Sequence, residues 1–190
     1  MRLQNQHYTI AASVETMPSL SQFDIVYNLS NAKTEDFYMA RIFRVCSFDG
    51  ISRSIALVDL LCAEYKPYAV LEDNFLTAIL FDSIVRINLA TSLVSQYEKC
   101  DNMGGLHEIH PMKDGYIIWG EGDIFRYDSA LNRIWNFSGR DILVSCNTDK
   151  HFWIEDGLIH CRDFLGWHYI IDFDGKLIRD FREFQDAEIL

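Results

Sequence analysis

Residues 114–128 read DGYIIWGEGDIFRYD, and this stretch decides the fold. It runs as one strand, breaks at the polar turn Glu121-Gly122-Asp123, and continues as a second strand that ends in Asp128. The same plan recurs at 74–88 (NFLTAILFDSIVRIN) and at 150–163 (KHFWIEDGLIHCRD). Short apolar strands bounded by turn residues are typical of antiparallel sheets. The three stretches are therefore interpreted as repeated β-hairpins.

The hairpins recur at a nearly regular interval. Their second strands begin at Ile84, Ile124 and Leu158, at offsets of 40 and 34 residues. A further strand follows each pair, and Asp-Gly pairs supply the positive φ that tight hairpin turns need. A period near 40 with short strands predicts propeller blades. The predicted fold is all-β, with propeller-like repeated antiparallel meanders over residues 68–180 that form a small four-bladed propeller or an incomplete one.

The amino-terminal third predicts strands outside this repeat. Apolar residues alternate from Tyr8 to Val14 and from Phe37 to Val45, where Arg41 interrupts the apolar face. Residues 54–61 are apolar on both faces, which predicts a strand buried on both sides. Because 190 residues suit one domain, we predict a single domain over 1–190. It comprises an irregular β segment (1–67), the repeats (68–180) and a tail (181–190), with a short helix expected within 179–190.

Part of the repeat is similar to known sequences. Residues 124–135 (IFRYDSALNRIW) resemble one repeat of the quinoprotein-like propeller families, in which a strand, an Asp, a turn and a Trp-bearing strand follow one another. Residues 171–178 (IDFDGKLI) are similar to the turn-and-strand part of that pattern. The resemblance covers about residues 68–180 and implies a propeller fold. A full quinoprotein propeller has far more blades than this chain, so the family's cofactor is not carried over and no cofactor is predicted.

Charge is concentrated in the repeats. The chain holds 17 Lys+Arg and 28 Asp+Glu, a net charge of -11, of which residues 1–67 carry -1 and residues 68–190 carry -10. This balance disfavours a nucleic-acid partner and an anionic membrane surface. Every apolar run is far shorter than the roughly 20 residues that span a bilayer. Five widely spaced cysteines without a C-x-x-C pair indicate reduced thiols, and we expect a cytoplasmic protein.

Two constellations could carry chemistry. His107 and His110 follow Cys100, but residues three apart on a strand point to opposite faces, so we predict no metal site. Carboxylate pairs occur in the turns, and acid–base catalysis needs two carboxyls roughly 5–10 Å apart in a pocket. Acidic residues are common in turns for structural reasons, so we predict no catalytic residues. Trp135 and Trp167 are predicted to lie in the core, whereas the sequence does not decide whether Trp119 and Trp153 are buried or exposed.

The leading prediction is a non-catalytic binding protein that holds a basic protein partner on its acidic surface. It is similar in type to the small acidic immunity proteins that neutralise bacterial toxins. The predicted partner contacts are the turn acids Glu121, Asp123, Glu155 and Asp156. One alternative is a small propeller enzyme that acts on glycosides through these carboxylates. Another is a homo-oligomeric, ring-completing subunit of a larger assembly, because an unpaired blade edge seeks a partner.

Overall fold

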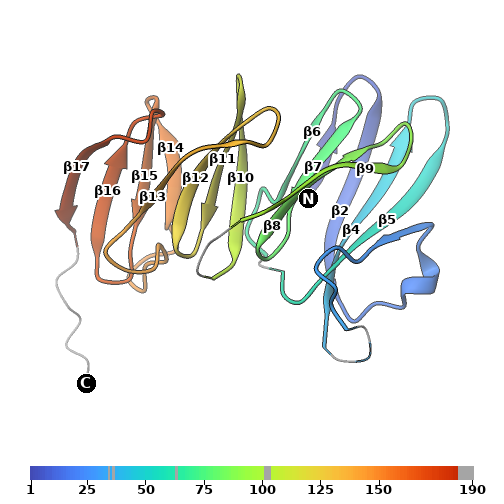
Figure 1. Cartoon of the computed structure of the whole chain (residues 1–190), viewed down its shortest axis with the longest axis horizontal. Coiled ribbons are helices and arrows are strands. Elements are labelled where there is room, and N and C mark those ends of the chain that lie inside the picture. Colours follow the sequence, from blue (N-terminus) through green and yellow to red (C-terminus); the bar gives the residue numbers. More distant parts are fainter. Residues whose placement is uncertain (34, 36, 63, 101–103, 184–190) are drawn as a thin grey trace. The chain divides into compact units, whose positions relative to one another are not determined.

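The fold consists of four consecutive β-sheets, here called A to D (Figure 1). The computed structural model describes residues 1–33, 35, 37–62, 64–100 and 104–183. Sheet A contains β1 (Arg2–Gln4), β2 (Tyr8–Thr16), β3 (Ile25–Tyr27), β4 (Met39–Ser47) and β5 (Ser52–Asp59). Sheet B contains β6 (Ala69–Glu72), β7 (Phe75–Ile79), β8 (Ser83–Asn88) and β9 (Leu93–Lys99).

Sheets B, C and D are four-stranded antiparallel meanders. Sheet C contains β10 (Leu106–Met112), β11 (Gly115–Gly120), β12 (Asp123–Asp128) and β13 (Arg133–Ser138). Sheet D contains β14 (Phe152–Glu155), β15 (Leu158–Arg162), β16 (Trp167–Ile171) and β17 (Leu177–Arg182). These sheets confirm the predicted all-β fold of repeated, propeller-like meanders that follow an irregular amino-terminal β segment.

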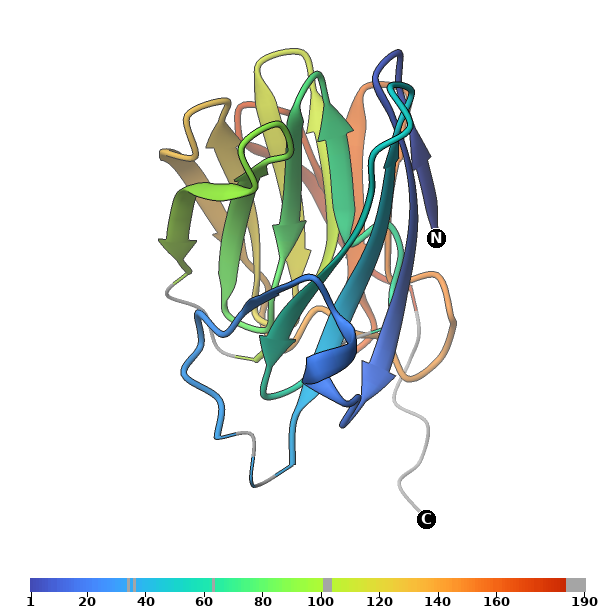
Figure 2. The same ribbon diagram turned by 90° about the vertical axis from the view of Figure 1, so that its right-hand side faces the viewer.

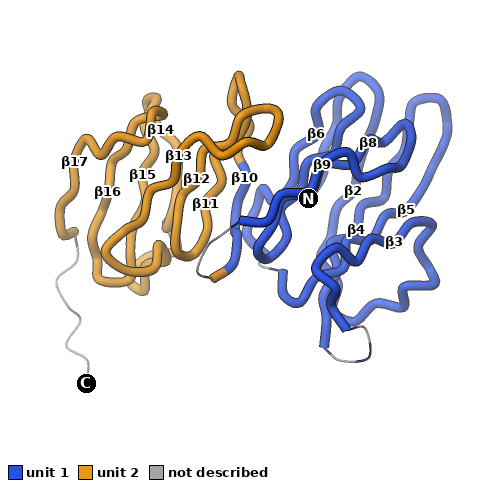
Figure 3. Tube along the Cα trace, viewed as in Figure 1, with its two compact units in different colours: residues 1–101, 105–109 blue, residues 102–104, 110–190 orange. Residues whose placement is uncertain are grey.

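The chain divides into two compact units (Figure 3). Unit 1 comprises residues 1–101 and 105–109, and it holds sheets A and B with the first half of β10. Unit 2 comprises residues 102–104 and 110–190, and it holds the rest of sheet C and sheet D. The predicted boundary at residue 67 falls between sheets A and B, inside unit 1. The single domain over 1–190 stays a prediction.

Sheet A departs from the meander. Its strand order is β1-β2-β4-β5-β3, and β3 pairs with β5 in parallel. Residues 55–58 of β5 are fully buried, as the apolar pattern over 54–61 predicted, but Leu60 and Leu61 follow the end of the strand and are exposed. The segment between β2 and β4 carries the 3-10 turn η1 (Leu20–Gln22) over one face of the sheet (Figure 2). There Phe23 packs against Ala40, Ile42 and Ala56.

Sheets B, C and D share one turn, which defines the repeat. Each third strand leads into Asn88, Asp128 or Asp172, whose side-chain oxygen accepts hydrogen bonds from two backbone N–H groups further along the turn. A register shift lies just before each of these residues. Asn and Asp suit this place because their side chains mimic the backbone carbonyl of a turn. The three positions are 40 and 44 residues apart in the sequence.

The predicted equivalence of the repeats is correct for the first two and wrong for the third. Ile84 and Ile124 lie in β8 and β12, the third strands of their sheets, but Leu158 begins β15, the second strand of sheet D. The turn 155–157 has the same polar chemistry as the turn before β12. Because a meander has such a turn at every strand junction, composition alone placed the third repeat one strand too early.

The burial of the tryptophans also differs from the prediction. Trp119 on β11 is 1% exposed and stacks on Phe152, with ring centroids 5.7 Å apart and the planes 6° apart. Trp135 and Trp167, predicted as core residues, are only half-buried. Trp135 lies on β13, the edge strand of sheet C, and Trp167 begins β16 beneath the guanidinium of Arg140, 3.8 Å from the ring centroid. Positions at a sheet edge and a strand end bury less of a side chain than the strand interior.

Helix is scarce in the described residues. The helix predicted within 179–190 is wrong for residues 179–182, which belong to β17 and pair with β16. Residues 184–190 lie outside the described ones. Within the described ranges, no helix has the length and apolar character required to cross a membrane.

Candidate functional site: the acidic end of unit 2

Carboxylates gather at one end of the sheets of unit 2. In an antiparallel meander the first and third turns lie at the same end, so the turns β10–β11 and β12–β13 share one end of sheet C, and β14–β15 and β16–β17 share one end of sheet D. A hydrogen bond of 3.1 Å from Trp135 Nε1 to the carbonyl of Phe173 joins these two ends. We call them together the acidic end. Its turns and adjoining residues carry Asp114, Asp128, Glu155, Asp156, Asp172 and Asp174, against Lys113, Arg133 and Lys176.

Two of these carboxylates, Asp128 and Asp172, hold the backbone of their own turns. Asp128 Oδ1 accepts hydrogen bonds of 2.8 Å from the N–H groups of Ala130 and Asn132. The Asn132 side chain donates to Asp128 Oδ2 at 2.9 Å, and these bonds lower the pKa of the Asp128 carboxyl. Asp172 accepts from the N–H groups of Asp174 and Lys176 in the same way. The acidic end therefore has a fixed backbone, and its charges stand at defined places.

A groove of about 280 Å³ opens at the acidic end, between β13 and the β16–β17 turn. Its walls include the half-buried Trp135, the 55%-exposed Ile134 and the carboxylate of Asp174. Gly175 carries a φ of +83°, and a Cβ there would lie 2.7 Å from the Trp135 ring, so glycine is required on both grounds. The charged residues of its lining are Lys113 and Arg126 beside Asp114 and Asp174. An aromatic anchor beside an exposed aliphatic residue within a polar rim has the composition of a protein-binding hot spot.

A buried arginine supports one wall of the groove. Arg126 on β12 is 5% exposed and donates to the carbonyls of Tyr116, at 3.3 Å, and Tyr127, at 2.5 Å. Its guanidinium also forms an ion pair with Asp114, whose side chain is 75% exposed. The Asp114 carboxylate is thereby held at the rim while most of its surface stays open to solvent. Its charge is partly compensated, so it contributes less to the acidic field than an unpaired carboxylate.

The structure separates the four predicted partner contacts into two pairs. Glu155 and Asp156 are exposed in the β14–β15 turn and belong to the acidic end. Glu121 and Asp123 lie in the β11–β12 turn, at the opposite end of sheet C, and both are half-buried. Asp123 accepts hydrogen bonds from the side chains of Ser138 and, at 3.3 Å, Asn136. One flat surface cannot present all four side chains.

Sequence reasoning missed the other carboxylates of the acidic end. In the sequence, Asp114 and Asp174 belong to Asp-Gly pairs and predict only turns, and Asp172 precedes one of these pairs. The sequence does contain a signal, since every first and third turn of sheets C and D carries at least one acid. That signal becomes readable only when the strands of sheet D are counted correctly, because the one-strand error assigns β14–β15 to the wrong end.

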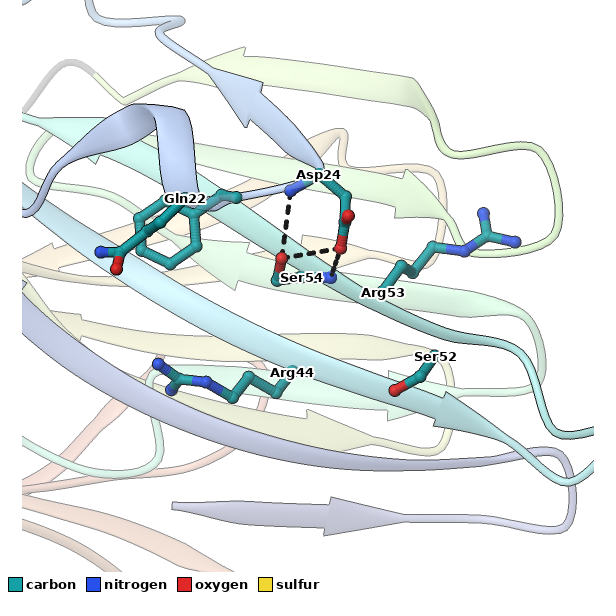
Figure 4. A pocket seen from close by; sticks show the side chains of 7 residues that line it. Gln22, Asp24, Arg44, Ser52, Arg53 and Ser54 are labelled. Atoms are coloured by element: carbon teal, nitrogen blue, oxygen red, sulfur yellow. Dashed lines mark hydrogen bonds between the residues drawn. The ribbon is translucent and has the colours of Figure 1, made fainter.

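A larger cavity lies on sheet A but brings no like charges together (Figure 4). It measures about 370 Å³ and lies where η1 and β3 meet β4 and β5. Asp24 accepts hydrogen bonds from the Ser54 N–H and hydroxyl, at 2.7 and 2.8 Å, which lower the pKa of its carboxyl. Figure 4 shows the side chains of Arg44 and Arg53 extending in opposite directions, so the cavity has no convergent cationic pair.

The histidine and cysteine constellation adopts the predicted strand. His107 and His110 both lie on β10, three residues apart and therefore on opposite faces. His107 packs on Tyr65, with ring centroids 4.7 Å apart, and His110 packs on Phe152, at 5.2 Å. Cys100 is buried. Among the described residues, no three His, Cys, Asp or Glu side chains converge as metal ligands would.

Comparison with known proteins identifies the fold and no family. No protein-family model matches the chain, and no curated protein matches it in sequence. The computationally designed Ika8 protein matches 80% of this chain with a TM-score of 0.53 and 9% identity, over 48% of its own length. Other matches are the designed Ika4 protein (TM-score 0.49, 9% identity, 66% of this chain, 78% of Ika4) and BamB from Moraxella catarrhalis (0.48, 11%, 83%, 50%). This chain spans about half the length of Ika8, and the likeness to that propeller protein concerns the fold alone.

Proposed function

We propose that this chain is a non-catalytic binding protein whose acidic end holds a basic protein partner. An immunity protein that neutralises a bacterial toxin is one protein of this type. The observation that carries the proposal is the set of six carboxylates on the four turns of the acidic end, of which Asp114 and Asp174 line the groove at Trp135. Complementary charge accelerates the encounter of two proteins, and a central aromatic anchor then slows their dissociation.

The acidic end has the two components that such an interface needs. Exposed Glu155 and Asp156 supply charge at the rim, where removal of a side chain does not disturb the fold. Ile134 and Trp135 supply apolar surface that a partner can cover. The glycoside-acting enzyme and the ring-completing subunit stay alternatives, and no cavity described above brings two of the turn acids Glu121, Asp123, Glu155 and Asp156 together.

Nuclear magnetic resonance with a labelled chain and an arginine-rich peptide as probe tests the location of the site. We expect the amide signals of the four turns of the acidic end to shift as the peptide is added, together with the indole signal of Trp135. Raising the salt concentration should weaken this binding, because exposed charges are screened beyond about 8–10 Å at physiological ionic strength.

The opposite end of sheet C supplies the internal control. Shifts confined to the β11–β12 turn at Glu121 and Asp123, or spread evenly over the surface, would contradict the acidic end as the binding site. Turnover of a glycoside that disappears with Glu155→Gln would instead support the enzyme.

A further inference from the structure

A buried carboxylate lines a cavity in unit 1, far along the chain from the acidic turns. Asp59, the last residue of β5, is 1% exposed. Its Oδ1 accepts a hydrogen bond of 2.8 Å from the Leu60 N–H, and its Oδ2 accepts one from the Phe81 N–H. Each oxygen keeps acceptor capacity beyond these bonds, because a carboxylate can accept about four hydrogen bonds.

The cavity measures about 330 Å³, at the lower end of the roughly 300–1,000 Å³ range of small-molecule pockets. It is formed by residues 29–31, the end of β5, the β7–β8 turn and β9. Its apolar and aromatic walls include Leu60, Phe81 and Tyr97, and its polar wall includes the hydroxyl-bearing Ser30. The cavity therefore combines apolar walls, which can contact the apolar part of a ligand, with a small number of polar groups.

The charges around this cavity favour a cation. Asp82, in the β7–β8 turn, also lines it and forms an ion pair of 3.1 Å with Lys99, whose side chain is 72% exposed. The fully buried Arg41 on β4 partly offsets the charge of Asp59. However, its guanidinium lies over the ring of Tyr68, 4.4 Å from the centroid, and Arg41 does not line the cavity. Two carboxylates against one lysine leave the cavity wall with a net negative charge when Asp59 is ionised.

We propose that this cavity binds a small organic cation, an alkylammonium or alkylguanidinium group, with its charge at Asp59 and its apolar body against Phe81 and Tyr97. Aromatic rings add to the attraction, because their faces are negative and draw cations. The group can come from a free small amine or from a lysine or arginine side chain of another protein. The site lies in unit 1 and does not depend on the acidic end of unit 2.

Binding of the cation should depend on pH. Burial raises the pKa of Asp59 to about 6, and the nearby Asp82 carboxylate adds to this effect. Backbone hydrogen bonds and Arg41 oppose it, Cys62 is a further titratable neighbour, and Lys99 pairs with Asp82. A protonated Asp59 does not attract a cation, so affinity should be about tenfold lower at pH 5 than at pH 7.5.

Titration of the full chain with n-butylammonium, followed by nuclear magnetic resonance, tests the site, with n-butanol as the uncharged control. A single charge-assisted contact of this size predicts a Kd on the order of 1 mM. Signals of Leu60, Phe81 and Tyr97 should shift with the amine and not with the alcohol. A second arm uses a short peptide with one lysine. If only n-butylammonium binds, the ligand of this site is a free amine. If the lysine peptide also binds, the ligand can be a lysine side chain of another protein.

Three variants separate this site from a general acidic surface. Asp59→Asn should reduce the affinity at least tenfold. Asp24→Asn is the matched control, because Asp24 also accepts a hydrogen bond from a backbone N–H but lines the cavity on sheet A, and the affinity of this variant should be unchanged. Lys99→Met should raise the affinity several-fold by releasing Asp82.

The wild-type chain gives a readout that holds even where Asp59→Asn fails to fold. Saturating n-butylammonium should lower the pKa of Asp59, observed through its carboxyl carbon signal, because the cation stabilises the ionised form. An unchanged pKa of Asp59, equal binding of n-butanol, or unchanged affinity between pH 5 and 7.5 would overturn the proposal.

Discussion

Two sets of charges, one in each unit, differ in their surroundings. Unit 1 buries Arg41 and Asp59 between strands, where backbone N–H groups and an aromatic ring surround them. Unit 2 exposes Glu155 and Asp156 on the β14–β15 turn, and Asp174 on a turn whose backbone is held by Asp172. Net charge does not distinguish the units, because unit 1 holds 13 acids and 8 bases and unit 2 holds 15 acids and 9 bases. The two sets of charges differ in burial, which net charge does not reveal. We therefore expect the buried charges to respond mainly to pH and the exposed charges mainly to salt.

The largest expected effect concerns the core that supports the exposed charges. Trp119→Ala should lower the free energy of unfolding by about 3–5 kcal/mol, because a fully buried aromatic leaves a cavity. Trp135→Ala should cost about 1 kcal/mol, because that ring is half-buried at a sheet edge. Chemical denaturation of both variants measures the difference. Equal losses would contradict the assignment of Trp119 to the core and Trp135 to the groove.

The second effect distinguishes the units by pH. Asp59 binds its proton more tightly in the folded chain, with a pKa of about 6, than in the unfolded chain, near 3.9. Its contribution to the free energy of unfolding is therefore present at low pH and is lost as the pH rises through about 6. Between pH 7 and pH 5 this contribution should grow by about 1 kcal/mol.

Denaturation of Asp59→Asn over the same range supplies the comparison. The free energy of unfolding of Asp59→Asn should not show this increase between pH 7 and pH 5, whatever its absolute value. Asp156→Asn, which changes an exposed residue of unit 2, should show the same increase as the wild type. If the wild-type chain and Asp59→Asn change in stability to the same extent between pH 7 and pH 5, Asp59 does not have a raised pKa in the folded chain.

The third effect divides the carboxylates of the acidic end among themselves. Asp172→Ala should cost about 1 kcal/mol by removing two hydrogen bonds to the backbone of its turn. Asp174→Ala, two residues away and exposed, should change stability by less than about 0.5 kcal/mol. Thermal unfolding followed by circular dichroism compares them. Equal effects would mean that Asp172 is not the residue that holds the turn.

Much of the fold was predictable because its causes are local. Alternating apolar residues and Asp-Gly turns predicted the meanders, and residues 55–58 predicted a strand buried on both faces. The strand at which the last repeat begins was not predictable in this way. The turns at Glu121 and Glu155 have similar compositions, but the first joins β11 to β12, the second and third strands of sheet C, and the other joins β14 to β15, the first and second strands of sheet D. The surroundings of Asp59 depend on Arg41, from β4, and Phe81, from the β7–β8 turn. These residues become neighbours of Asp59 only when sheets A and B fold.

The sequence predicted the negative charge of the candidate site, but only some of the residues that form it. The charge of residues 68–190 indicated an acidic surface, and Glu155 and Asp156 do lie in it. Glu121 was grouped with them because hairpin turns look alike in sequence, whereas strand order decides the end of the sheet at which each turn lies. The groove at Trp135 also depends on Gly175, which comes from another sheet.

The central claim is that the acidic end of unit 2 is where a basic partner binds. Association of the arginine-rich peptide should be measured by stopped-flow fluorescence at low salt with two double variants, Glu155→Lys/Asp156→Lys and Glu121→Lys/Asp123→Lys. Both variants change the net charge equally but alter opposite ends of the sheets, and circular dichroism checks that each variant keeps the fold, because Asp123 and Glu155 accept side-chain hydrogen bonds. We predict an association rate about three- to tenfold lower for Glu155→Lys/Asp156→Lys, with a smaller change for the other pair. Equal rates for the two variants, or a larger loss for Glu121→Lys/Asp123→Lys, would contradict the claim.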